Sequence, residues 1–559
     1  MTGDADYLAI AICAAVISLT LWVTFAVSRR ARSADGFFAA GRSISSWQNG
    51  FAIAGEFISA GSFLGTTGLI FYKGVDGAVI LCTSVVSFLP VLFLLAEKMR
   101  NVGKYTLADV LVFRTEARSV RIVVALSTIA TGTFVLLAQL VAAGVLLESV
   151  SGIPFWLSVI VAGTLMGIYV FVGGMLATTW VQVIKSTILS VLAVAVGLGI
   201  LAQFGFSFPK VLDTATDHAV AGEAVLSPGL IFGQTSALNL VSYSLAFALG
   251  TAGMAHILIR FFTVPEASTA RRSLGWTVAL CSMFYLIVIV MGFGAAALLG
   301  DEGADRVGAG GNLAAPVLVT ELGGGVGTIG GSIALAMVAA VAFASIVAVV
   351  AGVVISAAGT FARDIWPALT RTPPVDELDV AARTREENAQ ARVARFGAVA
   401  FSVVAIVLTM LIGDDTNITY FMGMAFMVAG SAHLPSLVLS LNWRRFNSTG
   451  AVWGILTGLI STVVSLMFTE ALWLGSGPAP PDDPAAGDRH HAARPGRVRR
   501  RLTRGRESAR TLRTRGREVR GDARARRDRH RGGGRDRPLT TGRRSRPPTD
   551  DGAEVTTAH

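Results

Sequence analysis

The sequence is poor in charged residues. They make up 15% of its 559 residues, whereas hydrophobic residues make up 52%; soluble domains average about 25% charged residues. The charges cluster between long apolar runs, each near the roughly 20 residues that a helix needs to cross a bilayer. Twelve such runs lie at about 7–28, 47–71, 75–97, 120–149, 154–174, 181–204, 231–257, 274–300, 327–360, 394–413, 419–441 and 450–473. The composition therefore predicts an all-α polytopic membrane protein.

Sequence motifs of enzymes and pumps are missing as well. The chain has no nucleotide-binding loop, zinc-ligand spacing or nucleophile elbow, so neither ATP-driven pumping nor enzyme chemistry is indicated, and we expect no cofactor. The three cysteines, Cys13, Cys82 and Cys281, all fall in apolar runs. This placement favours core positions over a disulfide or a metal site. The first run lacks an A-x-A-like cleavage site, and we interpret it as a retained span.

Basic residues are scarce in one set of alternate loops. That set holds only Lys210 and Arg306, whereas the other set carries clusters such as "SRRAR", "EKMRNVGK" and "NWRRF". Lysine and arginine accumulate in cytoplasmic loops. The pattern predicts a multi-pass protein of the plasma membrane with its N-terminus outside, in contact with lipid.

The C-terminal segment 475–559 has no lysine and no apolar periodicity. It holds 23 arginines against 11 acidic residues, while 1–474 has a net charge of −1. A basic arm for phosphates or anionic lipid is one interpretation. Twelve spans from an outside N-terminus would however leave this arm outside, against the loop rule. We favour a frameshift product, because G+C-rich sequence read out of frame is rich in arginine without lysine. Either way we expect disorder and no nucleic-acid partner.

One acidic residue, Glu56, lies inside an apolar run, in the stretch "IAGEFISAGSFLGTTG" at 53–68. It is about nine residues, or roughly 13 Å, into the second run. An ionised carboxylate at that depth must face the bundle interior, a water-filled cavity or a cation. A protonated, hydrogen-bonded structural glutamate is the other interpretation.

The same stretch combines glycines with hydroxyl side chains. The members of this set are Gly55, Gly61, Gly65, Gly68, Ser59, Ser62, Thr66 and Thr67. A helix that unwinds here would offer backbone carbonyls to a cation and helix N-termini to an anion. Simple close packing at the glycines is the alternative.

Two further runs contain notable residues. In the seventh run, Gly250 and Gly253 flank a predicted helix break, and His256 and Arg260 follow four residues apart on one helical face. They form either a gate or a structural pair whose arginine extends to the membrane surface. The ninth run is made almost wholly of small apolar residues, a composition that lets neighbouring helices approach closely.

Three long motifs, in order, resemble the sodium/solute symporter family. They are "AIAGEFISAGSFLGTTG" at 52–68, "GGMLATTWVQVIK" at 173–185 and "GTAGMAHILIRFFTV" at 250–264. The resemblance covers about 1–474 and is closest to the cation/acetate symporters, the acetate permeases. It implies a leucine-transporter-type inverted repeat of five plus five helices, with core repeats at about 47–204 and 231–441. Twelve spans are visible where the family has thirteen.

The resemblance also implies a cation site between the first and eighth core helices. It assigns backbone carbonyls at Gly55 and Ile58, and positions Ser345, Ala348 and Val349 in the ninth run. Ala348 and Val349 have no side-chain oxygen, so the chain departs from a five-oxygen sodium site. Glu56 would supply the missing charge or bind a proton instead. The coupling ion implied is Na+ or H+.

The substrate class implied by the resemblance is a short monocarboxylate such as acetate, propionate or pyruvate. Its carboxylate would be bound by hydroxyls and freed amides at Ser59, Thr66, Thr67, Gly250 and Gly253. A symporter for another small solute, such as an amino acid or a sugar, is an alternative. A sensor-type membrane protein that signals through the basic tail is another, and the oligomeric state stays open.

Overall fold

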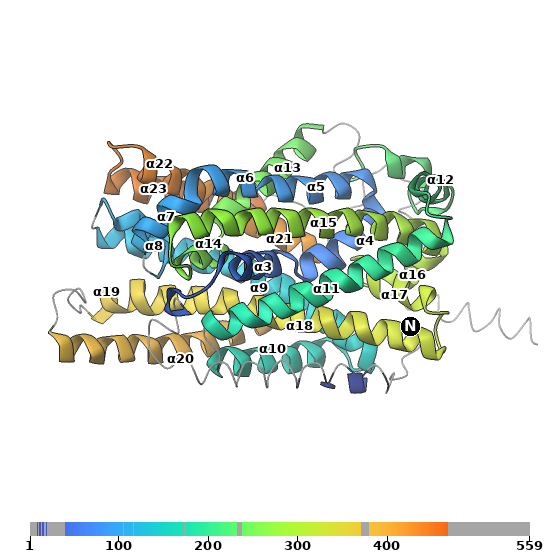
Figure 1. The fold of residues 1–559 in the computed structure, drawn as a ribbon, viewed down its shortest axis with the longest axis horizontal. Helices are drawn as coiled ribbons and strands as arrows, with labels where there is room; N and C mark the ends of the chain where they lie inside the picture. The colour runs from blue at the N-terminus through green and yellow to red at the C-terminus, as the bar shows by residue number, and fades with distance from the viewer. Residues whose placement is uncertain are drawn as a thin grey trace, which may run out of the picture. The chain divides into compact units, whose positions relative to one another are not determined.

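The computed structural model describes residues 40–467 apart from 104, 116, 173–174, 232–236 and 371–378, with a few residues between 8 and 18. Within this described part, every regular element is a helix (Figure 1). Most of the predicted run 7–28 and all of the tail 475–559 lie outside the described residues. The predictions made for them remain predictions.

Eight helices of the described part are long and apolar enough to cross a membrane. Two bent helix pairs and the shorter helix Phe155–Tyr169 add to them. Each predicted run from the second to the twelfth has a counterpart among these helices. The prediction of a polytopic helical membrane protein is confirmed.

The first series of spans begins with a broken helix. Its elements are α3 (Ser46–Phe57), η2 (Gly61–Gly65) and α4 (Thr66–Lys73), then α5 (Val75–Val86), α6 (Phe88–Pro90), η3 (Val91–Leu95) and α7 (Ala96–Val102), then α9 (Arg118–Ser151), α10 (Phe155–Val172) and α11 (Met175–Gln203).

The second series repeats this plan and again begins with a broken helix. Its elements are α13 (Ala237–Gly250), η5 (Thr251–Gly253), α14 (Ala255–Leu258) and η6 (Ile259–Phe262), then α15 (Ala267–Leu299), then α18 (Ile329–Thr360), η8 (Phe361–Ile365) and α19 (Trp366–Thr370), then α20 (Val380–Ile412), and finally α21 (Ile418–Val428), η10 (Ala429–His433) and α22 (Leu434–Asn442). The assignment of core repeats at about 47–204 and 231–441 stays a prediction.

Shorter elements connect the spans, and one more span follows them. The connecting elements are η1 (Ala40–Arg42), α8 (Leu107–Val112), α12 (Phe208–His218), η4 (Gly222–Leu226), η7 (Asp301–Gly303), α16 (Ala304–Val307) and α17 (Ala314–Leu322). The last span described is α23 (Ser448–Met467).

The two series interlock rather than pack as separate bundles. The first half of the first broken span, α3, lies against α15, while α9 packs against both α18 and α21 (Figure 1). The apolar window of the span that contains α18 is 100% buried, against 22% for that of α20. The small side chains of α18 explain this central position, because they allow close helix contacts on all sides. The centre of the fold is therefore shared by α3, α9, α11 and α18.

Both broken spans bend where glycines and hydroxyls meet. The axis turns by 56° between Ser46–Phe57 and Gly61–Lys73, and by 42° between Leu238–Gly253 and Ala255–Phe262. At the first break the Ser62 hydroxyl accepts a hydrogen bond from the Ser59 amide at 2.9 Å and donates to the Phe57 carbonyl at 3.0 Å. A side chain thus satisfies backbone groups that a bilayer would leave unpaired. The predicted breaks are confirmed.

The cysteines follow the prediction only in part. Cys281 is buried, but Cys82 is exposed on α5. Cys13 lies outside the described residues. The expectation of a core position was therefore wrong for Cys82, which lies on the outer face of an apolar helix where lipid would contact it.

We predict that Gly68→Ala destabilises the protein. A Cβ atom at Gly68 would lie 1.9 Å from the Gly311 carbonyl oxygen, and overpacking of this kind costs about 1–3 kcal/mol. The matched control is Gly199→Ala in α11, where no heavy atom lies within 4 Å of the added carbon. Melting temperatures of the purified variants in detergent compare the two. Equal melting temperatures would contradict the close contact between α4 and the loop that contains Gly311.

Candidate functional site

The centre of the fold holds a buried ion pair between Glu56 and Arg260. Arg260 Nη2 lies 2.7 Å from Glu56 Oε1, and the two side chains are 1% and 0% exposed. Gln182 Nε2 donates to the other carboxylate oxygen at 2.8 Å. Arg260 Nη1 donates to the Thr179 hydroxyl at 2.8 Å. The planar guanidinium therefore connects α3 to α11 through two separate contacts.

The carboxylate of Glu56 needs room that only glycine leaves. A Cβ atom at Gly352 of α18 would lie 2.0 Å from Glu56 Oε1. A Cβ atom at the neighbouring Gly55 would lie 2.7 Å from the Gln182 carbonyl oxygen. Gly55 therefore acts through close contact with α11. The structure places Glu56 between α3, α11, α18 and η6.

Arg260 does not extend to the membrane surface. Its side chain is fully buried, and it reaches across to the other broken span. The interpretation in which the arginine of the His256–Arg260 pair extends to the membrane surface is therefore wrong. His256 is also buried, on α14, which packs against α18. A gating role for these two residues stays a prediction.

A third charged residue, Lys185, lies nearby and was not among the predicted site residues. Lys185 of α11 is buried, and its Nζ lies 2.9 Å from Ser345 Oγ, 3.2 Å from the Ser345 carbonyl and 3.4 Å from the Ile58 carbonyl. The Ser345 hydroxyl also lies 3.2 Å from the Ile58 carbonyl. We call the three oxygens around Nζ, contributed by Ile58 and Ser345, the oxygen cage.

The residues around the cage do not fit the five-oxygen sodium site that the resemblance suggests. Ile58 and Ser345 do converge, but on the Lys185 ammonium. Ala348 and Val349 are buried in α18 and have no side-chain oxygen. Glu56, expected to supply a charge, faces Arg260 and Gln182 instead. In the described part of the chain, no group of three or more His, Cys, Asp or Glu side chains could hold a metal ion.

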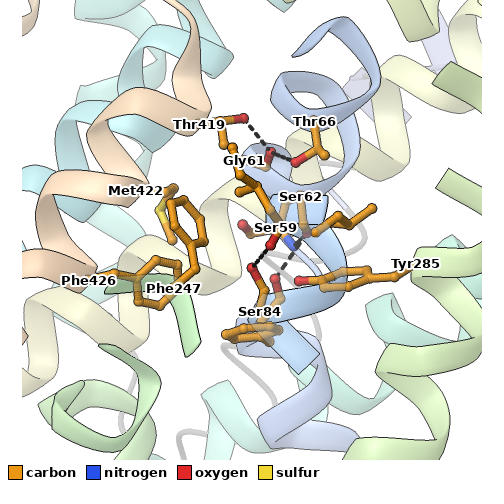
Figure 2. A pocket seen from close by; sticks show the side chains of 13 residues that line it. Ser59, Gly61, Ser62, Thr66, Ser84, Phe247, Tyr285, Thr419, Met422 and Phe426 are labelled. Carbon is orange, nitrogen blue, oxygen red and sulfur yellow. Dashed lines mark hydrogen bonds between the residues drawn. The ribbon is translucent and has the colours of Figure 1, made fainter. Parts of the chain in front are cut away.

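A small cavity opens beside the first break (Figure 2). Its volume is about 30 Å³. The hydroxyl side chains that line it are Ser59, Ser62, Thr66, Ser84, Tyr285 and Thr419. Figure 2 shows Phe247, Phe426 and Met422 on the opposite side from the α3–η2 break. None of the residues described as lining it is charged.

Two of the predicted substrate residues line the cavity. Ser59 lines it, and the Ser59 hydroxyl is buried without a hydrogen-bond partner. Thr66 lines it as well, with its hydroxyl on the Gly61 carbonyl at 3.1 Å. The predicted residue Thr67 does not line it, because its hydroxyl donates to the Phe63 carbonyl.

The two glycines of the second break also lie outside the cavity lining. Gly250 packs against Phe426, where a Cβ atom would lie 2.5 Å from that side chain. The Gly253 carbonyl faces His433 Nδ1 at 2.7 Å. Since a carbonyl only accepts, Nδ1 carries the proton, and Nε2 lies 2.6 Å from the Ser127 hydroxyl oxygen. These glycines shape the second break rather than contact the cavity.

Sequence reasoning missed Lys185, Gln182 and His433. Lys185 and Gln182 stand in the motif at 173–185, which served only to mark the resemblance. The rule that selected Glu56 could have found Lys185, because a lysine inside an apolar run is equally costly. His433 had no comparable signal, since a histidine in an apolar helix is frequently a packed core residue.

Most of the chain is similar in sequence to a known family of membrane transporters. The model of the sodium:solute symporter family matches residues 37–458. The chain is 39% identical over 473 residues to the uncharacterized symporter YwcA of Bacillus subtilis, covering 85% of this chain and 86% of that one. It is also 39% identical over 472 residues to a monocarboxylic acid transporter of Corynebacterium glutamicum, covering 82% of each.

A solved structure shows the same fold at low sequence identity. A Na+-coupled sialic acid symporter, in a substrate-bound outward-open state, superposes with a TM-score of 0.64. The match covers 83% of this chain and 98% of that one at 16% identity. The fold is thus the leucine-transporter type with its inverted repeat, as the resemblance implied.

We predict that Arg260→Met destabilises the protein more than Glu56→Gln combined with Arg260→Met. The single change leaves a buried carboxylate unpaired, which costs about 3–5 kcal/mol, whereas removing both charges is far less costly. Arg306→Met is the matched control, because the Arg306–Glu321 pair is about one third exposed and such pairs contribute about 0–1 kcal/mol. Thermal unfolding in detergent measures all three. A double variant no more stable than Arg260→Met would refute the pairing.

Proposed function

We propose that the chain takes up a short monocarboxylate together with a coupling cation. The premise is its family, because the chain belongs to the sodium:solute symporter family. Family and relatives are membrane transporters of small solutes. The proposal names acetate, propionate or pyruvate as solute, Na+ or H+ as coupling ion, and the plasma membrane as location.

The observation that carries the proposal is the small hydroxyl-lined cavity at the first break. The half-helix that begins at Gly61 starts at this cavity, with Ser59, Gly61 and Ser62 in its lining. The first amides of a helix have no partner within the helix. Together with the aligned peptide dipoles they favour a negative charge at that end. A carboxylate fits this position without needing a basic side chain.

The size of the cavity favours a solute of few atoms. A water molecule needs about 10–15 Å³ of such space, so about 30 Å³ holds two or three water-sized groups. Acetate, made of one methyl group and one carboxylate, is of about this size. The aromatic wall of Phe247 and Phe426 gives its methyl group an apolar surface.

The same features argue against the other solutes considered. An amino acid brings an ammonium, and none of the residues described as lining the cavity offers a carboxylate to it. A sugar is several times larger than the space available. The sensor alternative depends on the tail 475–559, which lies outside the described residues.

The proposal is tested by exchange and uptake in vesicles reconstituted with the full chain. Labelled pyruvate is the main probe, because its undissociated acid is scarce at neutral pH and leaks little through lipid. Exchange against unlabelled acetate, propionate, glucose or proline, with no gradient, defines the solute class. Sodium and pH gradients, imposed separately, then define the driving ion. Failure of every monocarboxylate to exchange would refute the proposal.

We predict that Ser59→Ala raises the KM for monocarboxylate about tenfold. A hydrogen bond to a charged group contributes about 1.5–3 kcal/mol, and about 1.4 kcal/mol corresponds to a factor of ten. Ser190→Ala in α11 is the matched control, since its hydroxyl is also buried without a partner but does not line the cavity. Initial uptake rates across a range of solute concentrations give both values. Equal KM values for the two variants would place the solute elsewhere.

A further inference from the structure

The oxygen cage has the chemistry of a site for a monovalent cation. Two main-chain carbonyls and one hydroxyl point at a single buried position from the end of α3 and from α18. Hard oxygen donors of this kind suit small metal cations. Lys185 Nζ takes this position, 2.9–3.4 Å from all three oxygens.

The charged side chains around the cage leave its three oxygens as the partners of the Lys185 ammonium. Glu56 and Arg260, whose opposite charges both act on Lys185, are paired with each other at 2.7 Å. α18 contributes no ionisable side chain at all. The ammonium is therefore held by neutral oxygens, as a bound Na+ would be.

We propose that Lys185 is a tethered cation, whose ammonium takes the place of Na+ in the oxygen cage and makes Na+ unnecessary there. The transport consequences rest on the proposed function, whereas the occupancy of the cage does not. Two positive charges cannot share a position enclosed by three oxygens. Removal of the ammonium should therefore create a vacancy that Na+ can fill, with water completing its shell.

Ion-dependent stability of the purified full chain tests the occupancy directly. Melting temperatures are compared in sodium, potassium and choline chloride at equal ionic strength. The wild-type protein should show no sodium-specific shift, because its cage is filled. Lys185→Ala should melt at a lower temperature in choline and regain several degrees in sodium. A sodium-specific rise for the wild-type protein would overturn the proposal.

Two matched variants separate the cage from general effects. Lys185→Arg retains a tethered cation and should show no sodium-specific rise. Ser190→Ala lies on the same helix without contacting the cage and should behave like the wild-type protein. A Lys185→Ala variant that folds but gains no response to sodium would overturn the assignment of the cage as a cation site.

Transport provides the second readout and remains decisive if Lys185→Ala does not fold. Wild-type vesicles should exchange pyruvate at the same rate, within about twofold, when sodium is replaced by choline, and a sodium gradient alone should drive no accumulation. Accumulation driven by that gradient would overturn the tethered-cation proposal and leave monocarboxylate symport intact. Absence of any monocarboxylate exchange would instead overturn the proposed function, and the melting data would still report on the cage.

Discussion

The buried ion pair between Glu56 and Arg260 is the contact on which the arrangement of the central helices depends. It joins the first half of one broken span to the second half of the other across 204 residues of sequence. Either charge alone would be strongly unfavourable in this interior. The positions of α3 and η6 are consequently fixed relative to each other, and Gly352 and Gln182 belong to this arrangement, one by leaving space and the other by donating a hydrogen bond.

The helix breaks set a second requirement, because a break frees backbone groups that lipid cannot satisfy. Individual polar side chains of this core form hydrogen bonds with these freed backbone groups. Ser62 bonds the Phe57 carbonyl and the Ser59 amide at the first break, Lys185 approaches the carbonyl of Ile58, and His433 approaches that of Gly253. The hydroxyl, the ammonium and the imidazole of these three residues in an otherwise apolar core are thus explained by backbone chemistry. Ser59 is different, since its hydroxyl is buried without a partner and lines a cavity.

Hydropathy and glycine spacing were sufficient to predict the spans from the second to the twelfth, the two breaks and the interior position of Glu56. These features are local, since each follows from about 20 consecutive residues. The partners of Glu56 were beyond that reasoning because they are set by packing between distant segments. Arg260 illustrates the point: position within its own run allowed a surface role, and only the neighbouring α3 and α11 make it a buried partner. Thr67 illustrates the reverse, since its type suited a solute site but its rotation on the helix directs the hydroxyl to its own backbone.

The geometry of the first break connects the two proposed sites. Ile58 offers its carbonyl to the oxygen cage, and the next residue, Ser59, offers its hydroxyl to the cavity. The Ile58 carbonyl and the Ser59 amide belong to one planar peptide unit, so a rotation of this unit reorients both groups together. Under the two proposals, Lys185 contacts this unit through the Ile58 carbonyl on one side, and Ser59 on the other side binds the solute. The tethered ammonium would thus orient the backbone next to the solute position without being an exchangeable ligand.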